Sequence, residues 1–268
     1  MLRPPPLACD CHVHVFGPFA RYPLDPARKY TPAESTLEDY QRVAATLGTG
    51  RAVLVQPSVY GTDNACQRDA MRALGERARG VAVIDDSVSD AQLRDLERDG
   101  FRGARLNVMR AGEFGSLERI AARVQALDWH IQLHLPGMLL PEIADRLLKL
   151  PTEFVIDHFG RLDARQGVEQ AGFQALLRLF DSGRCWVKLS APYRNDHAGA
   201  PYRKIAPFAH ALVKRNPERL VWGTDWPHPD MAVPPEATQL LDVMLDWVPD
   251  EKMRNRILVD NPAKLYRF

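Results

Sequence analysis

Two histidines separated by a single residue, His12 and His14, are the first side chains in the sequence that can do chemistry together. They lie in residues 9–17, where polar and apolar residues alternate up to a glycine, a pattern typical of a short β-strand. On a strand both imidazoles point to the same face, so they can share a metal ion, a water or a substrate oxygen. Two ordinary exposed histidines would show the same spacing, but the end of a strand is where α/β folds gather their chemistry.

The elements that must position this pair repeat along the chain as a short β-branched run followed by a longer stretch with helical periodicity. The runs that predict strands are residues 8–14, 51–56, 81–85, 103–108, 130–135, 153–158, 185–190 and 220–225. The stretches that predict helices are residues 37–47, 64–79, 90–99, 116–128, 141–150, 166–182, 202–215 and 236–247. Eight alternations favour an α/β fold, a single (β/α)8 TIM barrel over residues 1–268. An open doubly wound sheet is the alternative, disfavoured because no glycine-rich dinucleotide loop follows the first strand.

Composition agrees with one soluble barrel domain of 268 residues. The 35 basic and 34 acidic side chains leave a net charge of +1, which gives no reason to expect a nucleic acid or a membrane surface as partner. Apolar runs are far shorter than a membrane span, and the first residues lack the layout of a secretory signal. Four scattered cysteines without zinc-finger spacing predict reduced thiols and a cytoplasmic location. The oligomeric state stays open, with a homo-oligomer possible.

Polar side chains gather at the expected carboxyl ends of the strands, where a TIM barrel carries its active site. His158 ends the sixth predicted strand and Asp225 ends the eighth. Together with His12 and His14 they form a candidate cluster of three imidazoles and one carboxylate. Each residue alone has an ordinary structural explanation, but polar groups at all eight strand ends favour a shared site.

Four arginines also fall at or just after strand ends, which bears on the substrate. They are Arg105, Arg110, Arg161 and Arg194. Arginine binds carboxylates through paired hydrogen bonds, so four on one rim predict an anionic substrate with more than one acid group. One or two of them are expected to pair with Asp85, Asp86 or Asp157 instead.

Several longer segments resemble one known group of proteins. They are residues 10–18 (Asp-Cys-His-Val-His-Val-Phe-Gly-Pro), 21–23, 30–32, 55–64, 156–161 (Ile-Asp-His-Phe-Gly-Arg) and 222–228 (Trp-Gly-Thr-Asp-Trp-Pro-His). Their sequence and order are similar to those of the 2-pyrone-4,6-dicarboxylate lactonase-like family of the amidohydrolase superfamily. That family also holds sugar-acid lactonases and galactarolactone isomerases, and the resemblance covers essentially the whole chain.

The resemblance implies roles for individual residues. Asp225 would be the general base and then the proton shuttle, while His12, His14 and His158 would orient water and carbonyl. The implied substrate-binding residues are Tyr30, Ser58, Arg105, Arg110, Arg161 and Arg194. At the strand-five position the pyrone-dicarboxylate enzyme has a tyrosine, whereas this chain has His134, so the substrate itself can differ.

The metal content follows partly from what the predicted strands lack. No lysine stands on strand four or five to bridge two metal ions, and the nearest, Lys188, is on strand seven. A two-metal centre is therefore not expected, and the resemblance implies that no cofactor is required. A single Zn²⁺ on His12, His14 and Asp225 is chemically sound, because three protein ligands plus water is a catalytic zinc pattern.

The sequence thus predicts a hydrolase that opens a carboxylated lactone, such as 2-pyrone-4,6-dicarboxylate or a related lactone of aromatic-compound degradation, with water activated by Asp225. The alternatives are a metal-dependent sugar-acid lactonase or a lactone isomerase of the same family, with a decarboxylase more distant. A non-catalytic barrel that binds an anionic ligand is disfavoured, because binding alone would not need a base beside three imidazoles.

We predict that dialysis against a strong chelator leaves the activity essentially intact, because Asp225 can take a proton from water without a metal. The measurement is turnover before and after dialysis, with elemental analysis of both samples. One tightly held zinc per chain, with activity lost on its removal and restored on its return, would contradict this prediction.

Overall fold

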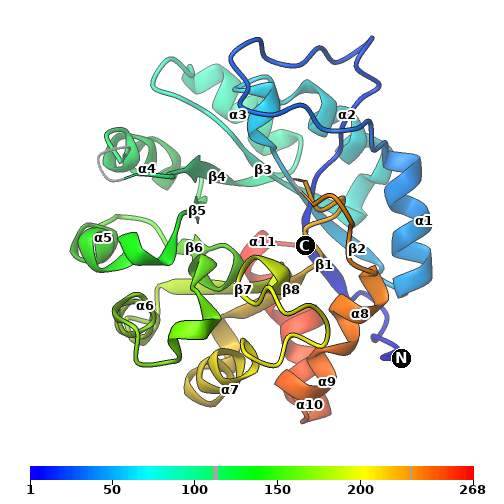
Figure 1. Ribbon diagram of the computed structural model, residues 1–268. Coiled ribbons are helices and arrows are strands. Elements are labelled where there is room, and N and C mark those ends of the chain that lie inside the picture. Colours follow the sequence, from blue (N-terminus) through cyan, green and yellow to red (C-terminus); the bar gives the residue numbers. More distant parts are fainter. Residues whose placement is uncertain (111–113, 230) are drawn as a thin grey trace.

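The structure is a computed structural model that describes residues 1–110, 114–229 and 231–268. Its centre is one sheet of eight parallel strands in chain order, with helices around it (Figure 1). The strands are β1 (Cys9–Val13), β2 (Arg51–Val55), β3 (Ala78–Ala82), β4 (Phe101–Asn107), β5 (His130–His134), β6 (Phe154–Ile156), β7 (Cys185–Ser190) and β8 (Leu220–Gly223). The predicted α/β TIM barrel is confirmed.

The helices follow the strands as the periodicity predicts. They are α1 (Leu37–Leu47), α2 (Ala65–Leu74), α3 (Asp90–Arg98), α4 (Leu117–Gln125), α5 (Leu140–Leu147), α6 (Ala171–Asp181), α7 (Ala206–Arg215), α8 (Ala237–Asp242), α9 (Met244–Trp247), α10 (Glu251–Asn255) and α11 (Asn261–Tyr266). Thr36 and Ser89 each cap the next helix through a capping box. None of these helices is long and apolar enough to cross a membrane, within the described residues.

Several boundaries differ from the sequence prediction, most of them by a few residues at the ends of elements. The helix predicted at residues 64–79 ends at Leu74, because Gly75 has φ +61° and a short turn, Gly75–Arg77, leads directly into β3. The third strand was expected at residues 81–85 but lies at Ala78–Ala82. Asp85 is excluded from it because its carboxylate accepts the backbone N–H of Ser87 at 2.8 Å, which turns the chain into a loop. The last two helices, α10 and α11, were not predicted, because a pattern of eight strand–helix pairs ends before them.

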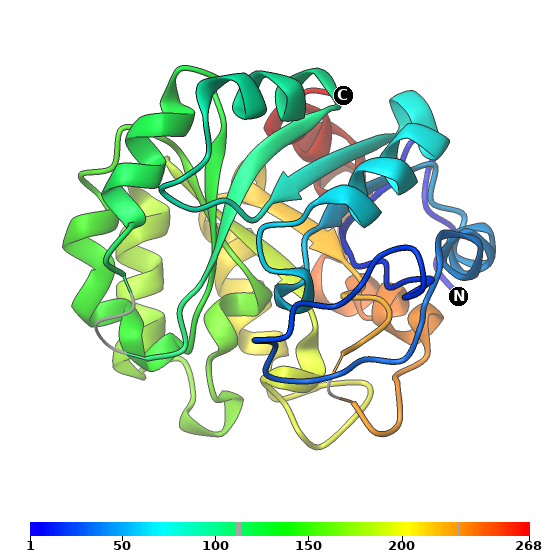
Figure 2. The same ribbon diagram turned by 90° about the horizontal axis from the view of Figure 1, so that it is seen from above.

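Alternating strand residues divide the apolar core into two layers. Ala52 and Leu54 of β2 belong to the large cluster that includes the helices, whereas Val53 and Val55 belong to a small cluster within the barrel. Tyr266 of α11 joins the small cluster and is fully buried. Figure 2 shows α11 at one end of the barrel and the long loops after β1 and β7 at the opposite end. The barrel is therefore closed by apolar packing at one end and carries its loops at the other.

The first and last strands are joined by backbone hydrogen bonds beyond the regular ladder. Asp225 donates its N–H to the carbonyl of His12 at 2.9 Å, and His14 donates to Trp226 at 2.8 Å. Gly223 is needed at this seam, because a Cβ there would lie 2.7 Å from the backbone nitrogen of His12. This seam brings His12 of β1 and His14, which directly follows it, beside Asp225.

A buried carboxylate fastens the same seam. Asp10 accepts hydrogen bonds from the backbone N–H of Thr224 at 2.9 Å and from its hydroxyl at 2.6 Å. Burial raises the pKa of Asp10 to about 6, and the bonds from Thr224 oppose that rise. The carboxylate form thus depends on Thr224 for its solvation.

Replacing Thr224 with Val should lower the free energy of unfolding by about 1–3 kcal/mol, because a buried carboxylate oxygen loses its donor. The loss should be larger at pH 8, where Asp10 is ionised, than at pH 5, where a protonated carboxyl needs the donor less. Urea unfolding at both pH values measures it. Thr46→Val, on the exposed face of α1, is the control, and equal losses in the two variants at both pH values would refute the role of this contact.

Candidate active site

Three imidazoles converge on one oxygen of one carboxylate. The distances to Asp225 Oδ1 are 3.5 Å from His12 Nε2, 3.4 Å from His14 Nε2 and 3.7 Å from His158 Nε2. All four side chains are buried. The structure therefore brings together the cluster that the sequence predicts from strands one, six and eight.

Backbone geometry at the strand ends aims these side chains inward. His14 directly follows β1, while His158 and Asp225 each lie two residues beyond the end of their strand. His158 has φ +55° and Asp225 has φ +66°, in the left-handed region that non-glycine residues seldom adopt. Such conformations concentrate at functional sites, where the surrounding structure holds them in place.

The second oxygen of Asp225 is already occupied. Oδ2 accepts a hydrogen bond from the Tyr193 hydroxyl at 2.6 Å and one from Arg194 Nε at 3.0 Å. Burial opposes ionisation of Asp225, but the facing His158 and the Arg194 guanidinium more than offset it and hold the pKa of Asp225 well below its usual range. At neutral pH Asp225 is therefore a carboxylate with Oδ1 turned toward the imidazoles.

The other ring nitrogen of each histidine has a different partner. His14 Nδ1 lies 2.7 Å from the carbonyl of Val55, which can only accept, so His14 carries its proton on Nδ1. His158 Nδ1 lies 2.8 Å from the Ser190 hydroxyl, which can donate or accept. Burial lowers the pKa of His158 well below its usual range even though Asp225 opposes it. His14 thus presents a bare Nε2 to the site.

His12 is held by a cation rather than by an acceptor. Its Nδ1 lies 3.2 Å from Lys188 Nζ. Burial and the Lys188 charge lower the pKa of His12 to about 3, so its imidazole is neutral at pH 7. Its Nε2 is buried and has no hydrogen-bond partner among the residues that the structure describes. Buried polar atoms usually have a hydrogen-bond partner, and this one lies within the cluster, 3.5 Å from Asp225 Oδ1.

Lys188 belongs to a buried polar layer beneath the imidazoles. Gln132 accepts from Lys188 at 2.8 Å and donates to Asp157 Oδ2 at 3.1 Å. Arg105 Nη2 lies 3.4 Å from the same Asp157 oxygen. The Lys188 and Arg105 charges, with His12, lower the pKa of Asp157 well below its usual range in spite of burial. Arg105 is thus one of the predicted rim arginines that pairs with an aspartate.

The remaining predicted residues lie at unequal depths. Arg161 and Arg194 line a pocket of about 590 Å³ together with Tyr193 and Met231. His134 ends β5 with its ring centre 5.5 Å from that of His158, and its Nδ1 lies 3.1 Å from Asn107 Oδ1.

Three predicted substrate-binding residues lie in loops or turns outside the strands. Tyr30 is half-buried in the loop after β1 and packs on the apolar core. Ser58 is exposed in a short turn, Ser58–Tyr60, and Arg110 is exposed beside residues 111–113, which lie outside the described part. Their roles stay predictions.

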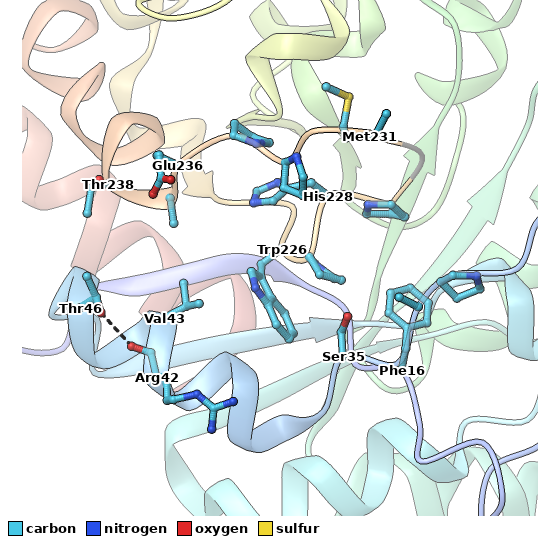
Figure 3. A pocket seen from close by; sticks show the side chains of 18 of the residues that line it. Phe16, Ser35, Arg42, Val43, Thr46, Trp226, His228, Met231, Glu236 and Thr238 are labelled. Carbon is cyan, nitrogen blue, oxygen red and sulfur yellow. Dashed lines mark hydrogen bonds between the residues drawn. The ribbon is translucent and has the colours of Figure 1, made fainter.

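A larger pocket, of about 890 Å³, borders the loop after β8 (Figure 3) and shares Met231 and Glu236 with the first pocket. Phe16, Trp226 and His228 line it. His228 Nδ1 is 3.3 Å from the Tyr193 hydroxyl. Tyr193 thus links the surroundings of this pocket to Asp225, a role that the sequence analysis missed, although its place next to Arg194 was a usable signal.

Two sets of side chains have the spacing of a metal site, within the described residues: His12, His14 and Asp225, and His12, Asp157 and His158. The separations of 3.4 Å and 3.5 Å in the first set suit neighbouring ligands of one tetrahedral zinc. His14 also suits it, because its Nδ1–H is donated to a carbonyl and its Nε2 is bare. His12 does not, because Lys188 faces the nitrogen that would have to carry the proton. The spacing fits a metal, but the hydrogen bonding of His12 does not.

Comparison with known proteins places this geometry in a family. The amidohydrolase family model matches residues 9–268. The chain belongs to the amidohydrolase family. It is 39% identical to a 4-sulfomuconolactone hydrolase of Rhizobium radiobacter, covering 97% of this chain and 89% of that protein. It is 38% identical to a 2-pyrone-4,6-dicarboxylate hydrolase of Comamonas testosteroni, covering 97% and 90%.

Two further proteins are similar to this amidohydrolase over nearly its whole length. A D-galactarolactone isomerase of Agrobacterium fabrum is 31% identical, covering 97% of this chain and 91% of that protein. The solved structure of an Acinetobacter baumannii protein, described as a probable 2-pyrone-4,6-dicarboxylic acid hydrolase with citric acid bound, is 28% identical with a TM-score of 0.85, covering 98% and 100%. The predicted resemblance to the lactonase-like family is confirmed.

Replacing Arg161 with Met should raise the KM for an anionic lactone by the equivalent of about 2–3 kcal/mol, because one charged hydrogen bond to an acid group is lost. Replacing Arg194 with Met should lower kcat as well, since Arg194 also binds Asp225. Steady-state kinetics of both variants on a charged lactone, with an uncharged lactone as control, measure this. An equal rise in the KM of Arg161→Met for both lactones would mean that Arg161 has a structural role only.

Proposed function

We propose that this amidohydrolase opens the ring of an anionic lactone with a water molecule activated by Asp225. The observation that carries the proposal is the one open oxygen of that carboxylate, Oδ1, faced by three imidazoles. Lactone hydrolysis needs a base for water, a donor for the carbonyl oxygen and a proton for the leaving ring oxygen. The cluster supplies a group for each of these needs.

The base in this proposal is Asp225 Oδ1, because Oδ2 is held by Tyr193 and Arg194. His14 Nε2 lies 3.4 Å from Oδ1 and is a second acceptor, since its proton is on Nδ1. A water that donates to both atoms turns its lone pairs toward the substrate. Asp225 takes one proton as the water oxygen bonds to the lactone carbonyl carbon.

The donor to the carbonyl oxygen is His12 Nε2, with His158 beside it. A donor that is already in place when the oxyanion forms stabilises the transition state more than the ground state. Asp225 then returns its proton to the ring oxygen as the carbon–oxygen bond breaks. The products are the released hydroxyl of the opened ring and a carboxylic acid, which gives the second water proton to solvent and becomes a carboxylate.

The substrate class rests on the arginines and on the relatives. Arg161 and Arg194 line a pocket whose Tyr193 and Arg194 bond to Asp225, and two relatives are named for lactones that bear acid groups. The citric acid in the solved relative fits the same anionic class. We therefore propose 2-pyrone-4,6-dicarboxylate or a related lactone of aromatic-compound degradation. The four buried free cysteines support a cytoplasmic location.

A lactone isomerase is the second candidate, favoured by the galactarolactone isomerase among the relatives. In that reaction a hydroxyl of the substrate takes the place of water, and the same carboxylate receives its proton. Turnover in ¹⁸O-labelled water distinguishes hydrolysis from isomerisation. The substrates to be tested are 2-pyrone-4,6-dicarboxylate, 4-sulfomuconolactone and D-galactarolactone. Hydrolysis puts ¹⁸O into the product and isomerisation does not. Binding without turnover of any member would overturn both.

Asp225→Asn should lower kcat by roughly 10²-fold or more, because the amide keeps the shape but cannot accept the proton. The Kd for an anionic ligand should change much less, since the arginines hold the acid groups. The native enzyme should show an acid limb below the usual range of an aspartate, because the pKa of Asp225 is held under its usual value, and the variant should lack this limb.

The measurements are kcat and ligand Kd side by side, with pH profiles of both proteins. A variant that binds poorly but turns over normally at saturation would make Asp225 a binding residue. An acid limb that persists in the variant would assign the titration to another group, such as Asp10, whose pKa is raised to about 6.

A further inference from the structure

Lys188 of β7 lies beneath the imidazole cluster and is fully buried. Its ammonium has three N–H donors, and three acceptors lie within 3.2 Å of Nζ, while Asp157 Oδ1 is farther away at 3.5 Å. The three acceptors are the Cys11 carbonyl at 2.9 Å, Gln132 Oε1 at 2.8 Å and His12 Nδ1 at 3.2 Å. With all three donors used, the one that points at His12 requires a lone pair on Nδ1.

The competing partner for His12 Nδ1 is Asp157, and it is placed less well. Asp157 Oδ1 lies 3.4 Å from that nitrogen and makes no hydrogen bond among the described residues. Its other oxygen receives the Gln132 amide N–H at 3.1 Å. Because Gln132 donates to Asp157, its carbonyl oxygen must face Lys188. This orientation holds the ammonium against His12.

We propose that Lys188 is a positioning residue that keeps the single proton of neutral His12 on Nε2, where it is the hydrogen-bond donor to the lactone carbonyl. A neutral imidazole has one N–H, so a lone pair at Nδ1 places the proton at Nε2. The same proton keeps His12 from ligating a metal, because a metal needs the lone pair of Nε2. Lys188 thus selects proton chemistry over metal chemistry at a cluster whose spacing suits either.

His14 differs from His12 in the partner of its Nδ1 atom. Its Nδ1 faces the carbonyl of Val55, an obligate acceptor, and its Nε2 is therefore bare. The rings of His12 and His14 have their centres 4.9 Å apart, but in this proposal one presents a donor to the site and the other an acceptor. One can accept from water while the other donates to the carbonyl oxygen. The difference comes from the residue behind each ring.

The first test is spectroscopic and needs no substrate. Proteins labelled with ¹⁵N at histidine are compared by NMR at neutral pH, with His12→Asn used to assign the His12 signals. The native protein should show Nε2 protonated and Nδ1 bare. In Lys188→Met the nearest partner of Nδ1 is Asp157, so the pattern should reverse. A native protein with the proton on Nδ1, or a variant with an unchanged pattern, would overturn the proposal.

The second test is zinc affinity, measured by titration calorimetry with Zn²⁺ on metal-free protein. Lys188→Met should bind zinc about 10–100-fold more tightly than the native protein, the usual scale for a partner behind a ligating histidine. Asp157→Asn keeps the Lys188–His12 bond and is the matched control, expected to show no such gain. Equal zinc affinity in the native protein and Lys188→Met would contradict the proposal.

The third test is kinetic and rests on the proposed lactone hydrolysis. Lys188→Met should lose roughly 10²-fold or more in kcat, as for removal of one oxyanion donor, with little change in KM. The double variant Lys188→Met/Asp157→Asn should regain part of kcat, because the new amide can donate to His12 Nδ1. The double variant removes one buried positive and one buried negative charge, so it can be tested even if Lys188→Met alone does not fold. A kcat loss without a change of tautomer would reduce Lys188 to a structural role.

Failure of the proposed function and failure of this inference are separable. If no lactone is turned over by the native enzyme, the NMR and zinc results still decide where the proton of His12 lies. If lactones are hydrolysed but the native His12 signal shows Nδ1 protonated, the function stands and the role of Lys188 does not.

Discussion

The seam between β1 and β8 is the contact on which the rest of the site depends. Asp225 donates its backbone N–H to the carbonyl of His12, and Asp10 accepts two hydrogen bonds from Thr224, which is 214 residues away in sequence. These bonds join the first and last of the eight strands. Without them His12 and His14 would have no fixed distance to the Asp225 carboxylate, which follows β8. Closure of the barrel and assembly of the site are thus the same event.

The seam places a carboxylate in a buried position, and the neighbouring groups determine its chemistry. A buried carboxylate is costly unless it is paired and hydrogen-bonded. Tyr193 and Arg194 meet this need at Oδ2 and leave Oδ1 as the only oxygen that faces the imidazoles. The Arg194 guanidinium therefore binds Asp225, the proposed base, and also lines the pocket proposed for the substrate.

A second charged layer lies below, built from Lys188, Asp157 and Arg105 with Gln132 between them. Such a layer contributes little net stability, because the desolvation of its charges offsets their attraction. Its value lies in orientation, since each member fixes where the next one donates or accepts. The spacing of the imidazoles alone would suit a metal ion, and this layer favours a proton at His12 instead.

The sequence by itself determined the barrel and the members of the cluster. Alternating strand and helix patterns give eight units, and a TIM barrel brings the carboxyl ends of its strands to one rim. His12, His14, His158 and Asp225 could therefore be grouped before any coordinate was known. The boundaries of β3 and the helices α10 and α11 were not predictable in this way, because loop hydrogen bonds and packing at the barrel end decide them.

Only the tertiary structure decided what each member of the cluster does. Arg105 and Arg194 look alike in the sequence, but one pairs with Asp157 beneath the site and the other with Asp225 in it. His12 and His14 also look alike, and they differ because a lysine of β7 stands behind one ring and a carbonyl of β2 behind the other. Hydrogen-bond direction depends on which atom faces which across the barrel. A strand pattern fixes the face on which a side chain lies, but not its partner.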